Sequence, residues 1–203
     1  ACYDGALAYG TPFISGKDSL NNEFQTVDGE TIAIPPTLLI SAISVVEDVG
    51  RCVTADAKSA GDALFLLGTT RPELGGSHLL LVEDVETGND VPPVDPAGSL
   101  RTMRAAQRAI EAGLVRACHD LSEGGLAVAA AEMAFAGGVG VEIDVSAMAV
   151  GGEVSPAGRL FGESAGRLLV EVAEADAERF AELAGDAPCA RGGGVTDTGR
   201  TVL

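Results

Sequence analysis

The sequence predicts a protein of the α/β or α+β class built on a mixed β-sheet. From residue 63 onward, short apolar segments rich in β-branched residues alternate with segments of helical periodicity. Hydrophobic residues make up 46% of the 203 residues and aromatic residues only 4%, so we expect a core of Ala, Val, Leu and Ile side chains. The pattern changes near residue 49, and we expect two domains, residues 1–49 and 50–203.

The first expected domain contains three extended segments. Residues 11–15 (TPFIS) follow Gly10, a residue type that commonly ends a helix, and they predict a short strand. Asp28 and Gly29 are typical of a hairpin loop. Residues 37–47 (TLLISAISVVE) are mostly apolar or β-branched, which predicts a largely buried strand.

The second expected domain begins with a buried strand at Ala63–Leu67, followed by a short helix at residues 74–81 behind the glycine pair of LGGSH. Pro, Gly and Asp are frequent in residues 87–98, which predicts a loop. Ser99 is a good helix-capping residue, and the apolar side chains after it recur at helical spacing, so we expect a helix at residues 99–113.

Helices and strands continue to alternate in the remaining sequence. Residues 139–145 alternate apolar and acidic side chains, as a half-buried strand does. The Ala-rich run at residues 126–136 predicts a helix. The other expected elements are strands at residues 114–118 and 167–172, helices at Pro156–Phe161 and residues 176–183, and a last strand near Cys189 or Val195.

The composition excludes several classes of protein. The net charge is −17, and the only lysines are Lys17 and Lys58, so the chain should repel nucleic acid and anionic membrane surfaces. The four cysteines are far apart and have no zinc-binding spacing, so we expect free thiols. With neither a signal-peptide pattern nor a run of eighteen apolar residues, a cytoplasmic location is expected.

The stretch SGKDSLNN combines the residue types that hold a phosphate and a divalent metal. It is not a P-loop, because five residues instead of four separate Gly10 from Gly16, and Asp18 follows Lys17 where Ser or Thr is required. Gly16 would still let a phosphate approach the backbone, Lys17 and Ser19 would donate to it, and Asp18 would offer Mg²⁺ an oxygen ligand. The alternative is an ordinary polar turn.

The motif HDLSEGG is predicted between a strand and a helix, a position where α/β proteins commonly bind ligands. Asp120 and Glu123 are candidate metal ligands, whereas His119 is more typical of a structural hydrogen-bonding residue than of a catalyst. The alternative for the whole motif is local: Asp120 or Ser122 caps the helix, and the two glycines permit tight packing.

The motif FGESAGR precedes a predicted strand and places a carboxylate, a hydroxyl and a guanidinium together. Glu163, Ser164 and Arg167 could hold a polar substrate. In the alternative interpretation, Glu163 and Arg167 form an ion pair with each other.

The motifs GKDS, HDLSEGGLA and FGESAGRLLV occur in this order, together with the segments IPPTLLISAISVVEDV and LGGSHL. Along nearly the whole chain, this pattern resembles the carboxyl-terminal part of the phosphoribosylformylglycinamidine (FGAM) synthase family. The wider superfamily includes aminoimidazole ribonucleotide (AIR) synthetase.

The resemblance implies a PurM-like architecture in a fragment of a longer enzyme. Residues 1–49 would be the end of the second ATP-binding domain, and residues 50–203 the α/β domain that follows it. The implied reaction is the amidation of formylglycinamide ribonucleotide with ATP and Mg²⁺. Its ammonia would come from glutamine through a glutaminase domain or subunit.

The resemblance also assigns functions to particular residues. It implies nucleotide binding by Gly16, Lys17 and Ser19, metal binding by Asp18 and Asp120, and substrate binding by Glu163 and Ser164. The family's first half has a Glu-Ser-Gln motif, and Ala165 replaces that Gln here. This departure suggests a site in this half that does not turn over substrate. Two alternatives stay open: another enzyme of the superfamily, such as AIR synthetase, or a noncatalytic scaffold that holds a structural nucleotide.

Overall fold

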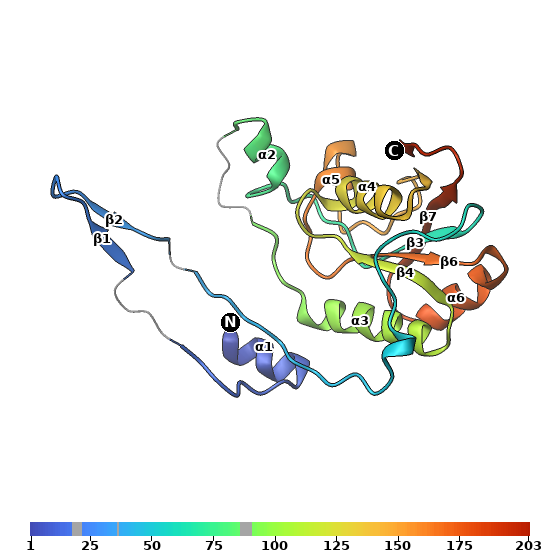
Figure 1. Ribbon diagram of the computed structural model, residues 1–203, viewed down its shortest axis with the longest axis horizontal. Coiled ribbons are helices and arrows are strands. Elements are labelled where there is room, and N and C mark those ends of the chain that lie inside the picture. The colour runs from blue at the N-terminus through green and yellow to red at the C-terminus, as the bar shows by residue number, and fades with distance from the viewer. Residues whose placement is uncertain (18–21, 36, 86–90) are drawn as a thin grey trace. The chain divides into compact units, whose positions relative to one another are not determined.

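The computed structural model describes residues 1–17, 22–35, 37–85 and 91–203 (Figure 1). It divides the chain into two compact units, residues 1–49 and 50–203. The first unit contains helix α1 (Cys2–Tyr9) and the strands β1 (Glu23–Gln25) and β2 (Thr31–Ala33). The two strands pair antiparallel around Asp28 and Gly29, which confirms the predicted hairpin.

Two predicted strands of the first unit are wrong. Residues 11–15 and 37–47 are not in strands, and side chains such as Leu39 and Ile43 are 88% and 87% exposed. An extended segment becomes a stable strand only when a neighbour pairs with its backbone and covers its side chains. Among the described residues of this unit, only β1 and β2 have such a neighbour.

The second unit is built on a six-stranded sheet with the order β4-β6-β3-β7-β5-β8 (Figure 1). All neighbouring strands are antiparallel except β5 and β8, which are parallel, so the predicted mixed sheet is confirmed. The strands are β3 (Ala63–Leu67), β4 (Val115–Asp120), β5 (Gly140–Ile143), β6 (Leu168–Val172), β7 (Cys189–Thr196) and β8 (Thr201–Val202). The last predicted strand is therefore a single strand that includes both Cys189 and Val195.

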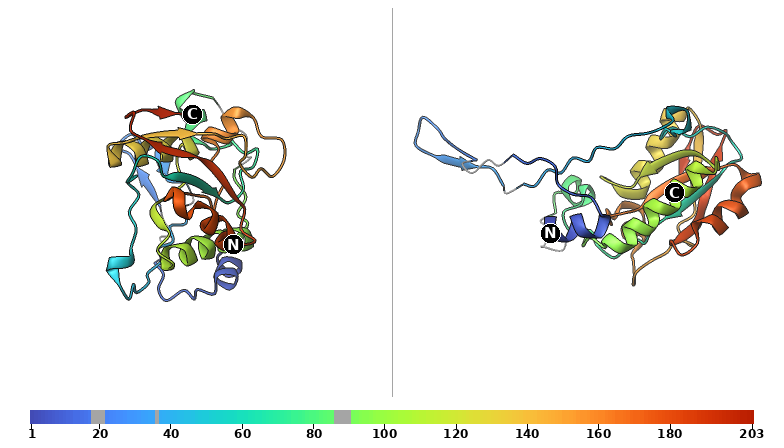
Figure 2. Two further views of the ribbon diagram at one scale, coloured as in Figure 1. Left: turned by 90° about the vertical axis from the view of Figure 1, so that its right-hand side faces the viewer. Right: turned by 90° about the horizontal axis from the view of Figure 1, so that it is seen from below.

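Helices cover both faces of this sheet (Figure 2). Helices α3 and α6 pack on one face, whereas α4 packs on the other and contacts α5. The helices of the second unit are α2 (His78–Val82), α3 (Pro96–Glu111), α4 (Gly125–Gly137), α5 (Pro156–Phe161) and α6 (Ala177–Ala184), with a 3-10 turn η2 (Glu174–Asp176). A further 3-10 turn, η1 (Val49–Arg51), includes residues of both units. In the described part of the chain, no helix is both long and apolar enough to span a membrane.

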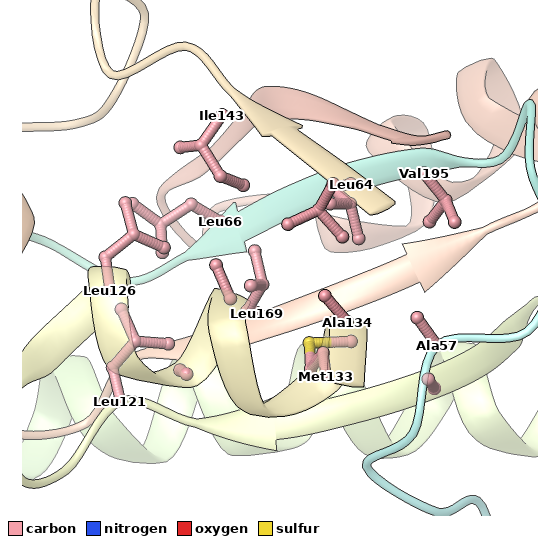
Figure 3. Packing of buried hydrophobic residues seen from close by; sticks show 14 of the residues in the cluster. Ala57, Leu64, Leu66, Leu121, Leu126, Met133, Ala134, Ile143, Leu169 and Val195 are labelled. Atoms are coloured by element: carbon pink, nitrogen blue, oxygen red, sulfur yellow. The ribbon is translucent and has the colours of Figure 1, made fainter. Parts of the chain in front are cut away.

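The second unit has a hydrophobic core on each face of its sheet, and strand β3 supplies apolar side chains to both. Leu64 and Leu66 pack against α4 and its neighbours in the cluster of Figure 3. Phe65, on the opposite face, packs against Phe180 of α6 with ring centroids 4.8 Å apart. The alternation of side chains along a strand produces this division, so β3 is buried on both faces.

Helix α3 begins earlier than predicted. Asp95 caps it by accepting a hydrogen bond of 2.9 Å from the Gly98 amide, and Pro96 occupies the first turn. An Asp-Pro pair supplies both the cap and the backbone angle that a helix start needs, so it takes precedence over Ser99. Ser99 lies inside the helix and is only 6% exposed.

The outer side of strand β4 is partly covered by a short segment of chain. Thr54 forms an isolated parallel bridge with Ala117, and the Cys118 amide donates a hydrogen bond of 3.1 Å to the Thr54 carbonyl. The other side of β4 pairs with β6 along its length.

A buried carboxylate connects β6 to the segment before β3. Glu171 is 0% exposed and accepts hydrogen bonds of 2.8–3.0 Å from the backbone amides of Lys58 and Ser59. Burial raises the pKa of Glu171, the neighbouring Asp62 adds to the rise, and the two amides oppose it. The folded protein therefore holds the Glu171 proton more tightly than the unfolded chain does.

We expect stability to depend on pH through Glu171. An acid whose pKa is raised by folding stabilises the protein below its unfolded pKa, ordinarily 4.5 for Glu, and this contribution is lost as the pH rises through the folded value. The difference in the free energy of unfolding between the wild type and Glu171→Gln should therefore fall as the pH rises above 4.5. Urea unfolding across this pH range measures it.

The matched control is Glu178→Gln, because Glu178 is an exposed acid on α6. The difference in the free energy of unfolding between the wild type and Glu178→Gln should not fall in this way as the pH rises. A Glu171→Gln difference that stays constant or rises with pH would contradict the expectation.

Candidate functional site

The two motifs that flank β4 and β6 lie side by side in the structure. HDLSEGG begins in β4 and continues beyond its end, and FGES directly precedes β6. Since these strands are antiparallel neighbours, Asp120 pairs with Leu168. The Leu121 amide donates a hydrogen bond of 3.1 Å to the Arg167 carbonyl, which extends the pairing beyond the strands. Two motifs that are far apart in sequence thus form one site.

Glu163 connects three motifs through a single oxygen. Its Oε1 accepts hydrogen bonds from the backbone amides of His78, at 2.9 Å, and Gly124, at 2.8 Å. The Nδ1 atom of the His78 ring lies 3.2 Å from the same oxygen. The side chain of Glu163 is 17% exposed, so solvent reaches only part of it. The carboxylate fixes LGGSH and HDLSEGG relative to its own loop.

Ser164 follows Glu163 in the sequence and is fully buried. Its Oγ atom accepts a hydrogen bond of 3.0 Å from the Arg71 amide and donates one of 2.9 Å to Oε2 of Glu73. The hydroxyl group is occupied on both sides by protein. Its direct observed role is to position residues 71–73 against the FGES loop.

Arg167 holds this loop from the inside. Its guanidinium is 2% exposed and donates to the carbonyls of Gly162 and Ser164 and to Oγ1 of Thr70. Burial lowers the pKa of Arg167 to about 10, although the nearby acid Glu73 acts in the opposite direction, so the group stays charged at neutral pH. No Glu163–Arg167 ion pair is formed, in contrast to the alternative considered for FGESAGR, within the part of the chain that the structure describes.

Asp120 is the exposed member of the site, with 66% of its side chain accessible. Ser122 donates a hydrogen bond to its Oδ2, and this bond is the main cause that lowers the pKa of Asp120. The carboxylate is therefore ionised at neutral pH and can offer an oxygen to a cation. Ser122 contacts Asp120, and neither side chain caps α4.

His119 has a structural environment. Its Nδ1 atom lies 2.6 Å from the Asp120 carbonyl, and its Nε2 atom lies 3.2 Å from Oε2 of Glu132 on α4. Both ring nitrogens face protein oxygens, which agrees with the interpretation of His119 as a structural residue.

The glycine pair of HDLSEGG allows the close packing that the sequence suggested. Gly124 has a left-handed φ of 76° and caps α4. A Cβ atom on Gly125 would lie 2.5 Å from the Gly162 carbonyl oxygen. A side chain at Gly125 would therefore push the FGES loop away from α4.

The cysteines have no place in the chemistry of this site. All four are free thiols, as predicted. Burial raises the pKa of both Cys118 and Cys189 to about 11, and Asp120 adds to the effect at Cys118. Both thiols are protonated at neutral pH, the form that is a weak nucleophile.

The predicted nucleotide and metal residues are divided between the two units. Asp120, Glu163 and Ser164 lie around the site in the second unit, whereas Gly16 and Lys17 belong to the first. Asp18 and Ser19 lie outside the described residues. Within the described ranges, no three His, Cys, Asp or Glu side chains are grouped as a metal site.

The sequence analysis missed three residues of the site. His78 was placed only within the predicted short helix at residues 74–81, and Arg71 and Glu73 were given no role. The glycine pair of LGGSH was the available signal for His78. Glu73 had none, because only the fold reveals that a residue far from 164 in sequence accepts a hydrogen bond from Ser164.

Comparisons with known proteins show which family the chain resembles. Residues 59–203 match the family described as AIR synthase related protein, C-terminal domain. The chain is 42% identical over 180 residues to the phosphoribosylformylglycinamidine synthase subunit PurL of Symbiobacterium thermophilum, covering 87% of this chain and 22% of that protein. It is 38% identical over 200 residues to the subunit of the same name from Anaeromyxobacter sp., covering 95% and 25%.

Solved structures share the fold. The structure titled T. maritima PurL complexed with FGAR has a TM-score of 0.66 at 23% identity, over 73% of this chain and 26% of that one. E. coli HypE, a hydrogenase maturation protein, has a TM-score of 0.53 at 25% identity, over 73% and 48%. The resemblance stated from the motifs is confirmed, and the chain spans about a quarter of the length of these curated relatives.

Removing the Glu163 carboxylate should loosen the three motifs. We expect Glu163→Ala to lower the free energy of unfolding by about 1–3 kcal/mol, because the part-buried hydrogen bond from the Gly124 amide and the more exposed one from the His78 amide are both lost. Hydrogen exchange should speed up at the His78 and Gly124 amides. The Gly158 amide, which donates to Ser155 Oγ, serves as an internal reference and should be unaffected.

Glu153→Ala is the matched control, since Glu153 is an exposed acid near the same loops in sequence. It should change neither exchange nor stability. Unaltered protection at both His78 and Gly124 in Glu163→Ala would show that Glu163 does not hold these segments.

Proposed function

Because this chain belongs to the AIR synthase related family through the C-terminal domain at residues 59–203, we propose that it is part of an FGAM synthase. In this proposal the whole enzyme is an ATP-dependent C–N ligase of purine biosynthesis. It converts formylglycinamide ribonucleotide to formylglycinamidine ribonucleotide with ammonia from a glutaminase domain or subunit, and it acts in the cytoplasm. The relatives named phosphoribosylformylglycinamidine synthase subunit PurL support this proposal.

The observation that carries the proposal is the three-way connection at Glu163. LGGSH, HDLSEGG and FGES are among the segments that carry the family resemblance, and one carboxylate oxygen holds all three. A shared polar site explains why these separate segments occur together. In this site Glu163 and Ser164 are proposed to bind or position the substrate.

The proposal includes the binding of Mg²⁺ and ATP by specific residues. Asp120 is exposed, ionised and able to supply one oxygen ligand, and Mg²⁺ commonly takes only one or two protein carboxylates alongside water and phosphate. In the first unit, Asp18 is proposed as a metal ligand, and Gly16, Lys17 and Ser19 are proposed to contact the nucleotide. Bound Mg²⁺ would neutralise phosphate charge in such a site. Residues 1–49 are proposed to be the end of an ATP-binding domain, and residues 50–203 the α/β domain.

A scaffold role is the second candidate, and Ala165 is the observation that favours it. A small side chain stands where the family's first half has Gln, so one substrate contact is missing. In that case this half of the enzyme would hold a nucleotide or dock the glutaminase without turnover. A different superfamily reaction, such as that of AIR synthetase, would be distinguished by turnover without glutamine or ammonia.

We expect the 203-residue chain alone to form no FGAM from formylglycinamide ribonucleotide, ATP, Mg²⁺ and ammonia. The reason is that it covers only 22–25% of its relatives, so most of the walls of a nucleotide site would have to come from elsewhere. Product formation followed by mass spectrometry is the measurement. Turnover by this chain without any other polypeptide would contradict the expectation.

In the whole enzyme, Glu163→Gln and Asp120→Asn separate the two candidate functions. If this site binds substrate and metal, each change should lower kcat/KM about tenfold or more, the size of one lost charge-assisted hydrogen bond. The melting temperature should stay close to that of the wild type for Asp120→Asn, since Asp120 is exposed. Glu153→Gln is the control. Unchanged turnover with weakened assembly would favour the scaffold.

A further inference from the structure

Two buried acids meet between strand β6 and the turn that precedes β3. Glu171 is 0% exposed and Asp62 is 7% exposed. Their carboxyl groups lie within hydrogen-bonding reach of each other. Ionised carboxylates only accept hydrogen bonds, so a hydrogen bond between these two groups requires that one of them carries a proton. Neither acid belongs to the site proposed above.

The charged groups around Glu171 are paired with other partners. Strand alternation points its side chain toward the face of the sheet on which α4 packs. The only charged side chain of α4, Glu132, pairs with His119 of β4 at 3.2 Å. Lys58 pairs with Asp56 at 2.9 Å, and strand β3 has no charged side chain. The acid partner therefore decides the charge of Glu171.

Arg116 of β4 is the cation on the Asp62 side of the pair. Its Nη1 atom lies 2.9 Å from Oδ2 of Asp62, and its side chain is 42% exposed. This Oδ2 is buried and has no hydrogen-bond donor among the described residues, so the Arg116 contact is an ion pair without hydrogen-bond alignment. A cation beside Asp62 favours the ionised form of Asp62, which leaves the proton on Glu171.

The turn at residues 59–62 is held at two ends. At one end, Glu171 accepts the two backbone hydrogen bonds described above. At the other end, the Gly61 amide donates a hydrogen bond of 2.8 Å to the Val195 carbonyl of β7, and the Val195 amide donates one of 2.9 Å to the Asp62 carbonyl. Loss of the proton acts differently at these ends, because an ionised Glu171 is a better acceptor for amides but repels Asp62.

We propose that Asp62 and Glu171 share one proton and that this proton holds the turn at residues 59–62 against β7. While the proton is present, the two carboxyl groups attract each other and the turn stays paired with Val195. When the proton is lost, two like charges meet in a buried place, and Asp62 moves away together with its backbone. The inference does not rest on the proposed function.

The titration of the pair can be followed by NMR of the side-chain carboxyl carbons in the full chain. We expect the pKa of Glu171 to lie above its ordinary value of 4.5 and to fall in Asp62→Asn, because Asn carries no charge. The matched control is Asp197→Asn, which removes an exposed acid just after β7. It should leave the titration of Glu171 unchanged.

Hydrogen exchange, corrected for the intrinsic pH dependence of amide exchange, reports on the turn. As the pH rises through the titration of Glu171, protection of the Gly61 and Val195 amides should fall about tenfold, the equivalent of a coupling of about one pKa unit between the acids. Protection of the Lys58 and Ser59 amides should be kept, because their acceptor becomes stronger.

Two variants keep the test decisive. Asp62→Asn and Glu171→Gln each leave a side chain that can hydrogen-bond the remaining acid without a shared proton, so protection at Gly61 and Val195 should stay constant with pH. Asp197→Asn should lose protection as the wild type does. The proposal is overturned if the pKa of Glu171 is the same in the wild type and Asp62→Asn, or if protection at Gly61 and Val195 in the wild type does not change with pH.

Discussion

The buried guanidinium of Arg167 is the interaction on which the site depends. It donates to two carbonyls of its own loop and to Thr70 of a segment far away in sequence, with almost no access to solvent. A charged group is removed from water at considerable cost, so the surrounding acceptors must stay in place for the fold to keep it there. The Arg167 side chain thereby holds the loop that presents Glu163 and Ser164.

The site is formed by loops that adjoin strands of the six-stranded sheet. Strands β4 and β6 supply two of them, and the chain after β3 supplies residues 70–78. Since β3 is buried on both faces and pairs with β6 and β7, these loops begin from the best-packed part of the domain. The hydrogen bonds of Glu163 connect segments that the sequence analysis had singled out as separate motifs.

The sequence predicted most elements of the second unit because their patterns were complete within it. Pro156–Phe161 and Ala63–Leu67 have the expected bounds, and the mixed sheet is present. Residues 37–47 failed because an apolar pattern shows that a segment is suited to burial, whereas burial itself needs a partner. Glu163 and Ser164 were recognisable from their motif, but Glu73, Arg71 and the buried role of Arg167 depend on contacts between segments that no local pattern records.

The contact of Thr54 with β4 also affects whether the edge of the sheet can pair with another molecule. An edge strand exposes a row of unpaired amides and carbonyls that can pair with the edge of another molecule. In this domain the bridge from Thr54 to Ala117 and the bond to Cys118 occupy part of that row, so the sheet ends at a capped border. The short segment before β3 thus protects the protein from edge-to-edge self-association, a property that matters most at high concentration and during folding, when sheets are still open.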